Sequence, residues 1–323
     1  MKILITGVAG FIGYHLVKRL LSMRVHITGI DNLNNFYDIN LKKNRLEILK
    51  LEGLKNKNFF FKELDINDMD SLKSDFDLII HLAAQAGVRV PKNMEKNYQH
   101  SNILGFKEVV SYALKNKIPN FIYASSSSVY DDNDKTPYSE KTTNLNPKST
   151  YGKTKQFNEE YINIISNQVN FMRFIGLRFF SVYGPYGRPD MAYYLFTRSI
   201  LNNEDIKLHN SGKMSRDMTY IDDIVDGIVL SIKYTMNPTN IFKNKIFNLG
   251  NDYPISTLKL LNVIEKNLNM RAKVTNIKAR NESKITHADI SKSKKELGYD
   301  PKFTLDIGME KFISWLKRYE SET

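Results

Sequence analysis

The sequence lacks cysteine and long apolar runs, and each absence excludes certain classes of function. With no cysteine among 323 residues, disulfide scaffolds, thiol nucleophiles, cysteine-ligated zinc and iron–sulfur clusters are excluded. No stretch approaches roughly 18 uninterrupted apolar residues, so we expect no membrane partner. The six histidines are scattered along the chain, and we therefore predict no metal site.

The composition is that of an ordinary globular protein, with 41% hydrophobic and 25% charged residues. The net charge of +12 reflects lysines spread along the whole chain and not a basic tail, so we expect no nucleic-acid partner. Glycines interrupt the apolar run MKILITGVAGFIG, which therefore differs from a signal peptide. We expect a cytoplasmic protein large enough for an enlarged domain or two sub-domains.

Short buried strands alternate with helical patterns in the first half of the chain, which predicts a doubly wound, parallel, Rossmann-type α/β sheet. We place a cofactor-binding domain at residues 1–180 and a smaller α/β substrate-binding lobe mainly at 181–323, with interleaved pieces. The expected strands lie at 2–6, 25–30, 59–61, 78–82, 121–124 and 171–179. The expected helices include 68–74, 98–116, 151–165 and 305–318.

A glycine-rich turn follows the first expected strand. Gly7, Gly10 and Gly13 have a spacing that lets backbone amides approach a pyrophosphate at the start of the next helix. Asp31 ends the next strand, where a carboxylate accepts hydrogen bonds from both ribose hydroxyls and repels a 2′-phosphate. The pattern favours NAD over NADP, and a purely structural turn with a capping aspartate is the alternative.

A second group of residues has the chemistry of a proton-transfer site. Ser126 lies in a run of four serines that ends an expected strand, and Tyr151 precedes Lys155 by one helical turn. A nearby ammonium lowers the pKa of a phenol, so such a tyrosine can act as a base. Tyr14 and Lys18 have the same spacing, although a packed helix face explains that pair. A polar loop remains the alternative for the serines.

The chain resembles the extended short-chain dehydrogenase/reductases, specifically the nucleotide-sugar epimerases, and most closely the UDP-glucuronate 4-epimerases. The matching segments run in order from residue 6 to about 224. They are TGVAGFIGYH, DNLNNFYD, HLAAQAGVR, YASSSSVY, YGKTK, LRFFSVYGPYGRPDM and GKMSRDMTYIDDI. The first and fifth identify only the superfamily, whereas DNLNNFYD, AQAGVR and GPYGRPDM point to the glucuronate group.

The resemblance implies a tightly bound NAD that is regenerated in each cycle, with Tyr151 as base, Lys155 as the group that lowers its pKa, and Ser126 orienting the sugar hydroxyl. It assigns further residues to the cofactor. These are Gly7, Gly10, Phe11, Ile12 and Gly13 at the pyrophosphate, Asp31, Asn32 and Asn35 at the ribose, Asp65 and Ile66 at the adenine, Leu82, Ala83, Ala84 and Asn102 in the remaining groove, and Phe180 near the nicotinamide.

The resemblance also implies a UDP-sugar substrate. UDP-glucuronate oxidised at C4 is a β-keto acid that loses CO₂ readily, so an epimerase must hold its carboxylate. Hydroxyls and a guanidinium fork suit that task. The residues implied near the substrate are Ser126, Ser127, Ser128, Ser181, Arg188, Arg216 and Arg89. A solvated loop is the alternative for Arg188, and a surface charge is the alternative for Arg89.

Several alternatives stay open from the sequence. Epimerases of UDP-glucose, UDP-N-acetylhexosamine or UDP-pentose, and UDP-glucuronate decarboxylases, share the same chemistry, while an inactive dinucleotide-binding module belongs to another class. The chain also departs from the family pattern at Asp131 and at Arg280-Asn281-Glu282. The family suggests a homodimer built from the helices near 98–116 and 150–165, and surface polysaccharide as the destination of the product.

Overall fold

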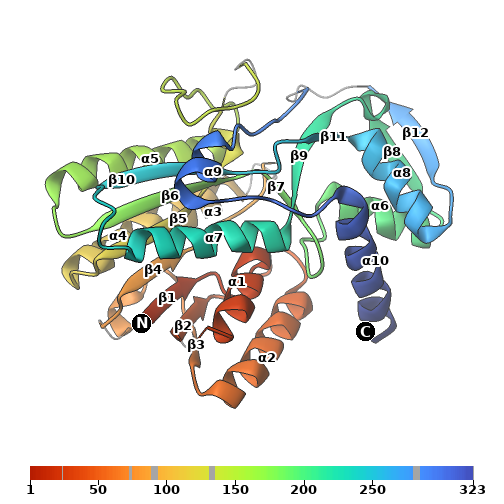
Figure 1. Cartoon of the computed structure of the whole chain (residues 1–323). Helices are drawn as coiled ribbons and strands as arrows, with labels where there is room; N and C mark the ends of the chain where they lie inside the picture. The colour runs from red at the N-terminus through yellow and green to blue at the C-terminus, as the bar shows by residue number, and fades with distance from the viewer. Residues whose placement is uncertain (24, 73–74, 89–93, 131–134, 279–283, 323) are drawn as a thin grey trace.

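The computed structural model describes residues 1–23, 25–72, 75–88, 94–130, 135–278 and 284–322. Figure 1 shows strands and helices alternating through the first half. The strands are β1 (Lys2–Thr6), β2 (His26–Asp31), β3 (Phe59–Glu63), β4 (Leu78–His81), β5 (Asn120–Ser126), β6 (Arg173–Phe179), β7 (Ser181–Tyr183), β8 (Asp205–His209), β9 (Ser215–Tyr220), β10 (Asn244–Leu249), β11 (Pro254–Ser256) and β12 (Lys273–Ile277).

The α-helices span between three and nineteen residues. They are α1 (Phe11–Leu21), α2 (Ile39–Asn56), α3 (Glu95–Asn97), α4 (Gly105–Lys115), α5 (Thr150–Gln168), α6 (Ala192–Leu201), α7 (Ile221–Met236), α8 (Thr257–Leu268), α9 (Ser291–Leu297) and α10 (Leu305–Glu322). The helix expected near 98–116 begins as a π-helix, η3 (Tyr98–Leu104), and continues as α4. The helix expected near 68–74 is a 3₁₀ turn, η1 (Met69–Ser71).

Within the described residues, seven parallel strands form the large sheet in the order β10-β6-β5-β4-β1-β2-β3. Ile3 of β1 pairs with Ile27 of β2 on one side and with Leu78 of β4 on the other. The strand order reverses between β1 and β4. Open α/β sheets bind ligands at such a reversal, outside the carboxyl ends of the strands. The fold therefore places the expected site at the ends of β1 and β4.

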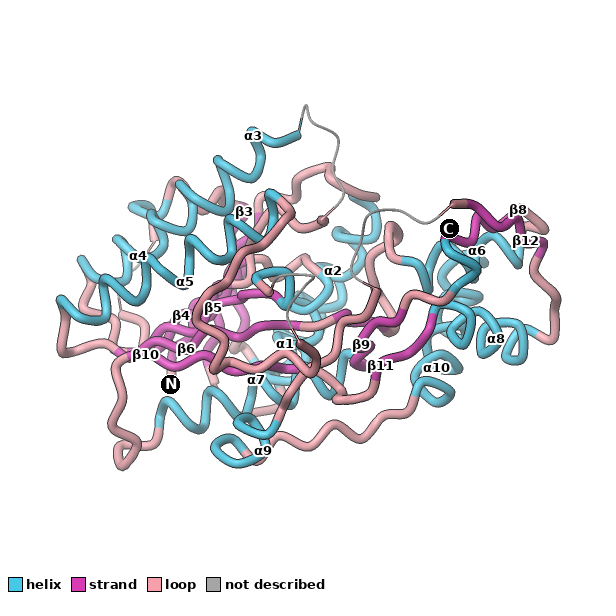
Figure 2. The backbone as a smooth tube through the Cα atoms, turned by 90° about the horizontal axis from the view of Figure 1, so that it is seen from above, coloured by secondary structure: helices cyan, strands magenta, loops and turns pink. Residues whose placement is uncertain are grey.

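Both faces of this sheet are buried. Successive side chains of a strand point to opposite faces, so each strand contributes to two separate cores. In β1, Ile3 and Ile5 join one core cluster, whereas Leu4 joins another. The first cluster includes side chains from α1, α2 and α7, and the second includes side chains from α4 and α5. Figure 2 shows α4 and α5 on one side of the strands and α7 and α9 on the other.

The second lobe contains a three-stranded sheet, β11-β9-β7, and a two-stranded sheet, β12-β8. Helices α6, α8 and α10 pack against one another around them, at the right in Figure 1. The chain also returns to the large sheet after residue 181, since β10 pairs with β6 along Phe247 and Leu177. The core that contains Ile3 continues into the lobe as far as Trp315. None of the helices in the described ranges has the length and apolar character that a bilayer crossing requires.

Candidate active site

The glycine-rich turn after β1 lies against the end of β4. Gly7 has a φ of 77°, and a Cβ there would come within 2.7 Å of the backbone nitrogen of Ala83. A Cβ on Gly13 would lie 2.1 Å from the carbonyl oxygen of Gly7. Side chains are therefore excluded at both positions. The first amides of α1 stay open toward the cavity, as binding of a pyrophosphate requires.

Asp31 ends β2 beside this turn. Its carboxylate accepts hydrogen bonds from the amides of Ala9 at 3.0 Å and Leu33 at 2.9 Å. Burial raises the pKa of Asp31, while these hydrogen bonds and the ammonium of Lys42 oppose the rise. Lys42, in the first turn of α2, donates to the carbonyl oxygen of Asn34 at 2.6 Å and also lines the cavity. The sequence analysis missed Lys42, which lies four residues after the end of the DNLNNFYD motif.

The carboxylate of Asp65 lies beside Asn32, which donates to it at 2.8 Å. Partial burial would raise the pKa of Asp65, but hydrogen bonds from Asn67, Asn32 and His100 outweigh it and lower the pKa to about 2. Asn102 is buried, and its amide group bonds the backbone of Gln85 at 2.8 and 3.1 Å. It thereby holds the segment after β4 in place.

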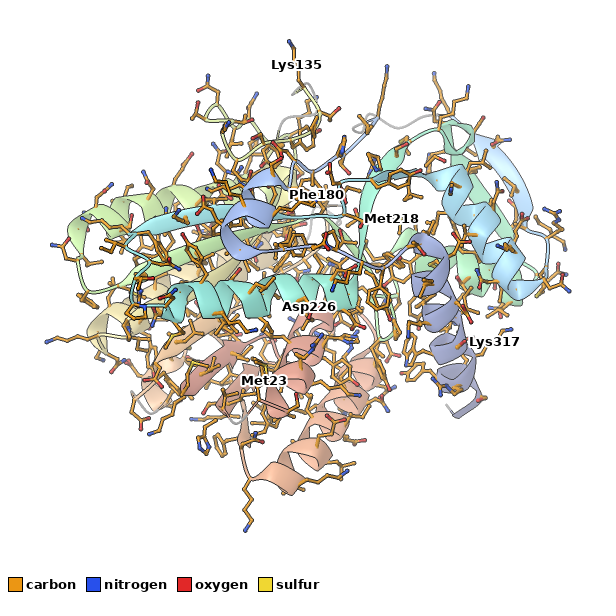
Figure 3. The ribbon with its side chains drawn as sticks, viewed as in Figure 1. Met23, Lys135, Phe180, Met218, Asp226 and Lys317 are labelled. Atoms are coloured by element: carbon orange, nitrogen blue, oxygen red, sulfur yellow. The ribbon has the colours of Figure 1, made fainter. Side chains whose placement is uncertain are left out.

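The structure brings most of the expected residues to one cavity. Those that line it are Gly7, Gly10, Phe11, Ile12, Gly13, Asp31, Asn32, Ile66, Leu82, Ala83, Ala84, Ser126, Ser127, Ser128, Tyr151, Lys155, Phe180, Ser181 and Arg188. Four others, Asn35, Asp65, Asn102 and Arg216, are not among the lining residues. Asn34 lines the cavity where the sequence analysis expected Asn35. Figure 3 labels Phe180, which lies where the large sheet meets the second lobe.

Arg216 belongs to β9, and its guanidinium donates to the carbonyl oxygen of Ser215 at 2.9 Å. Three further positions from the sequence analysis, Arg89, Asp131 and the segment Arg280-Asn281-Glu282, lie outside the described residues.

Ser126, Tyr151 and Lys155 meet above the carboxyl end of β5. Ser149 caps α5 by accepting from the amide of Gly152 at 3.0 Å, which fixes the helix start one residue before Tyr151. Lys155 donates to the carbonyl oxygen of Ala124 at 2.9 Å, with its ammonium 5.9 Å from the centre of the Tyr151 ring. The helix and the strand therefore present the three side chains to the same space.

The electrostatics of this group differ from the expectation in one respect. Burial raises the pKa of Tyr151, while the positive charge of Arg188 and a hydrogen bond with Ser126 act to lower it. Burial lowers the pKa of Lys155 to about 8, against a raising effect of Glu159. The resemblance assigned the stabilisation of the phenolate to Lys155. In the structure, Arg188 is the cation that opposes the effect of burial on Tyr151.

Ser127 and Ser128 lie in a 3₁₀ turn, η4 (Ser127–Val129), which Ser126 caps by accepting from the amide of Ser128 at 3.1 Å. Arg188 lines the same cavity. Its guanidinium forms a fork with Asp190, at 3.0 and 2.5 Å, and lies 5.7 Å from the ring centre of Phe36. The arrangement combines two hydroxyls and one oriented guanidinium, which suits an anionic group.

A sequence model of the NAD dependent epimerase/dehydratase family matches residues 3–250 of the chain. The chain belongs to this family. UDP-glucuronate 4-epimerase 4 of Arabidopsis thaliana is 39% identical, over 99% of this chain and 76% of its own length. Protein CapI of Staphylococcus aureus is 36% identical over 99% of each chain.

Solved structures show the same likeness within the epimerase/dehydratase family. The crystal structure of UDP-glucuronic acid 4-epimerase from Bacillus cereus, in complex with UDP-glucuronic acid and NAD, has a TM-score of 0.90. It is 34% identical in sequence and covers 99% of this chain and 100% of its own. The residues present here fit NAD, because Gly7 and Gly13 leave the pyrophosphate turn open and Asp31 stands at its edge.

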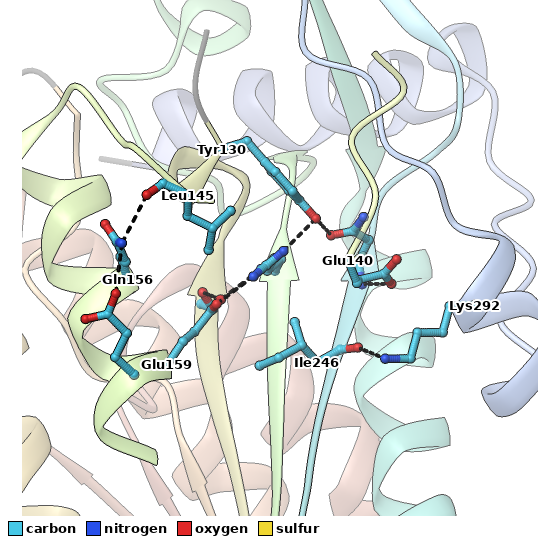
Figure 4. A network of polar contacts seen from close by, with 11 residues as sticks. Tyr130, Glu140, Leu145, Gln156, Glu159, Ile246 and Lys292 are labelled. Carbon is cyan, nitrogen blue, oxygen red and sulfur yellow. Dashed lines mark hydrogen bonds and ion pairs between the residues drawn. The ribbon is translucent and has the colours of Figure 1, made fainter. Parts of the chain in front are cut away.

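A buried polar network lies beside Ser126 in this epimerase-family chain (Figure 4). Arg178 of β6 forms a two-fold pair with Glu159 of α5, at 2.9 and 2.6 Å, and donates to the hydroxyl of Tyr130 at 2.8 Å. Ser125 donates to Glu159 at 2.5 Å, and Tyr130 donates to Asn248 at 2.8 Å. The network joins α5 and the ends of β5, β6 and β10, so it supports the strand edge on which Ser126 stands.

Proposed function

We propose that the protein interconverts UDP-glucuronate and UDP-galacturonate by transient oxidation at C4 of the sugar. The observation that supports this most directly is the single cavity in which Tyr151, Lys155 and the serine run face Arg188 beside the cofactor turn. Relatives named UDP-glucuronate 4-epimerase, and a solved relative in complex with UDP-glucuronic acid and NAD, support the choice of sugar.

Tyr151, Ser126 and Lys155 have different roles in proton transfer. Tyr151 takes the proton of the sugar 4-hydroxyl, and Ser126 orients that hydroxyl through the hydrogen bond it shares with the phenol. Lys155 is held by the carbonyl oxygen of Ala124 and keeps a positive charge beside the ring. NAD, held at the turn of Gly7 and Gly13 beside Asp31, would supply the hydride acceptor for C4 and the hydride donor for the other face of the ketone.

Ser127, Ser128 and Arg188 hold the sugar carboxylate. Loss of CO₂ from a β-keto acid requires the carbon–carbon bond to the carboxylate to lie parallel to the π orbitals of the ketone. These three donors, which line the same cavity, fix that bond in another orientation. Asp190 accepts hydrogen bonds from Nε and Nη2 of Arg188, so the guanidinium is oriented before substrate arrives, with Nη1 not engaged by Asp190.

The test is incubation of the purified protein with UDP-glucuronate, followed by proton NMR without added NAD. We expect UDP-galacturonate to form, and Tyr151→Phe to reduce the rate by about 10²–10⁴-fold. The matched control is Tyr14→Phe, since Tyr14 has the same spacing to Lys18 on α1 and should leave the rate unchanged. Formation of UDP-pentose and CO₂ in place of UDP-galacturonate would contradict the proposal, as would exclusive turnover of UDP-glucose or a UDP-N-acetylhexosamine.

We also propose a homodimer in which η3–α4 and α5 pack against their mates. Leu104 is 49% exposed and Ile164 is 56% exposed on these helices, so each presents an apolar side chain to solvent. Sedimentation velocity should give a dimer, and Ile164→Lys should shift it toward the monomer. A monomeric parent protein would refute this arrangement.

A further inference from the structure

The loop before Arg188 is held by side chains from the beginning of the chain. His15 of α1 donates through Nε2 to the carbonyl oxygen of Pro185 at 2.9 Å. Arg45 of α2 donates through Nη2 to the carbonyl oxygens of Tyr186 at 2.6 Å and Gly187 at 3.3 Å. Burial lowers the pKa of His15 to about 3, so the ring is neutral and its hydrogen bond persists at neutral pH. Three consecutive carbonyls are thus anchored.

Arg45 also holds the cofactor turn. Its Nη1 donates to the carbonyl oxygen of Ala9 at 2.8 Å and to the hydroxyl of Tyr37 at 2.6 Å. One guanidinium therefore connects the turn that faces the pyrophosphate with the loop that precedes Arg188. Its planar fork suits this task, because a single ammonium cannot reach both groups of acceptors at once.

The burial of Arg45 is unusual for a charged side chain. The residue is 0% exposed, and within the described ranges no carboxylate forms an ion pair with it. Its Nε has no hydrogen-bond partner among the described residues. Asp31 acts on Arg45 through its charge alone, and a buried cation that lacks a direct ion pair is costly. Such a cost is typical of residues that serve a site and not the stability of the fold.

The anchored loop has little freedom to adopt another conformation. Tyr186 has a φ of 56°, a left-handed conformation that is unfavourable for a tyrosine and is maintained by the contact of its carbonyl with Arg45. A Cβ on Gly187 would lie 1.7 Å from the hydroxyl of Tyr193. The backbone immediately before Arg188 is therefore fixed from two sides.

We propose that Arg45 is a positioning residue that acts through Arg188 and determines whether the oxidised substrate is epimerised or decarboxylated. The inference rests on the proposed function. When the loop is fixed, the Arg188 guanidinium holds the carboxylate away from alignment with the ketone. When the loop shifts, the carboxylate can align.

The competing reaction follows from that alignment. The bond between C5 and C6 breaks, CO₂ leaves, and the electron pair forms an enolate across C5 and C4. The enolate takes a proton at C5, and return of the hydride to C4 gives a UDP-pentose. No further oxidant or reductant is needed. The ratio of UDP-pentose to UDP-galacturonate therefore reports the position of Arg188, independently of the total rate.

Arg45→Lys is the decisive variant, because it keeps the charge and removes the fork. We expect the ratio of UDP-pentose to UDP-galacturonate to rise by about tenfold, since a displacement near 1 Å commonly has effects of that size or larger. Arg173→Lys is the matched control. Arg173 likewise donates to two backbone carbonyls, those of Asn237 and Asn240, but at the opposite end of β6 from the cavity. It should leave the ratio unchanged.

Two further measurements separate this proposal from other roles of Arg45. In an Arg188→Lys background, Arg45→Lys should change the ratio by less than about twofold, because coupled residues are not additive. NAD affinity of the apoprotein, measured by calorimetry, should be nearly unchanged in Arg45→Lys. An unchanged ratio with weaker NAD binding would overturn the proposal and assign Arg45 to the cofactor. An additive effect in the double variant would overturn it as well.

If Arg45→Lys does not fold, His15→Phe removes the third anchor of the same loop and should raise the ratio to a smaller extent. An unchanged ratio in that variant would then contradict the proposal. Failure of the proposed function is distinguishable, because in that case the parent protein itself forms no UDP-galacturonate.

Discussion

Two arginines are buried at different places in this molecule, and their surroundings differ. Arg178 lies at the carboxyl end of β6 with a two-fold ion pair to Glu159 and a hydrogen bond to Tyr130. Arg45 lies between the cofactor turn and the loop before Arg188, where its partners are carbonyl oxygens and a phenol. The first guanidinium has a carboxylate in direct contact, whereas no carboxylate among the described residues forms an ion pair with the second.

This difference indicates two ways to use a buried charge. Burial alone would lower the pKa of Arg178, but the hydrogen bonds and charge of Glu159 raise it, so the pair stays ionised as a unit. Such a unit stabilises the strand ends that it joins. Arg45 instead donates to backbone carbonyl oxygens, and its contribution is to fix their positions. We therefore expect substitutions at the Arg178 pair to change mainly the free energy of unfolding, and substitutions at Arg45 to change mainly the ratio of products.

Breaking the Arg178 pair should have the largest effect on stability. Glu159→Gln leaves the Arg178 charge uncompensated in the core and should reduce the free energy of unfolding by about 3–5 kcal/mol. Urea denaturation followed by circular dichroism measures the change. The double variant Glu159→Leu/Arg178→Met should recover part of the loss. A loss below about 1 kcal/mol would show that the pair behaves like an exposed one.

The same region should respond to pH through Lys155. Burial lowers the pKa of Lys155 from 10.5 to about 8, so between these values the unfolded chain binds more protons than the folded one. The penalty for burying the ammonium is complete below pH 8 and is relieved as the pH rises toward 10.5. As the pH rises from 8 to 10.5, the free energy of unfolding of the parent should therefore increase by roughly 2–4 kcal/mol relative to that of Lys155→Met. A difference independent of pH would mean that the ammonium is not desolvated.

Substituting Arg45 should cost less stability than breaking the Arg178 pair. Arg45→Met leaves the carbonyls of Ala9 and Tyr186 without a donor, but it also removes an unpaired buried charge. We expect a loss of about 1–3 kcal/mol, which is the usual cost of unsatisfied buried groups. The measurement is urea denaturation beside Glu159→Gln. An equal or larger loss for Arg45→Met would remove the distinction between the two arginines.

The cofactor side of the site was the more predictable part of the molecule. Gly7 follows β1, Gly13 lies in the first turn of α1 and Asp31 ends β2, and the parallel sheet brings such positions together. Tyr151 and Lys155 share one helix face, so their spacing alone predicts that they meet. The alternation of strands and helices likewise predicts the parallel sheet, but not β10, which joins its edge from residues 244–249.

The loop before Arg188 could not be predicted in the same way. Arg45 contacts Tyr186 and Gly187 across 141 and 142 residues of sequence, and no local pattern indicates such contacts. Lys42 was missed for a related reason, since a lysine in a lysine-rich helix has no distinctive spacing. The π-helix at Tyr98–Leu104 was likewise hidden within an ordinary helical pattern. Long-range packing decides all three features.

An exposed arginine should make the smallest contribution to the free energy of unfolding among the three arginines compared. Arg19 of α1 bonds Asp226 of α7 at 2.6 Å, and both side chains are nearly half exposed (Figure 3 labels Asp226). The pair joins elements 207 residues apart, as Arg45 does across 141, yet water solvates both of its charges. Arg19→Ala should therefore change the free energy of unfolding by at most about 1 kcal/mol, and less in high salt. If urea denaturation gave a loss as large as that of Arg45→Met, sequence separation and not burial would determine the contribution of each arginine.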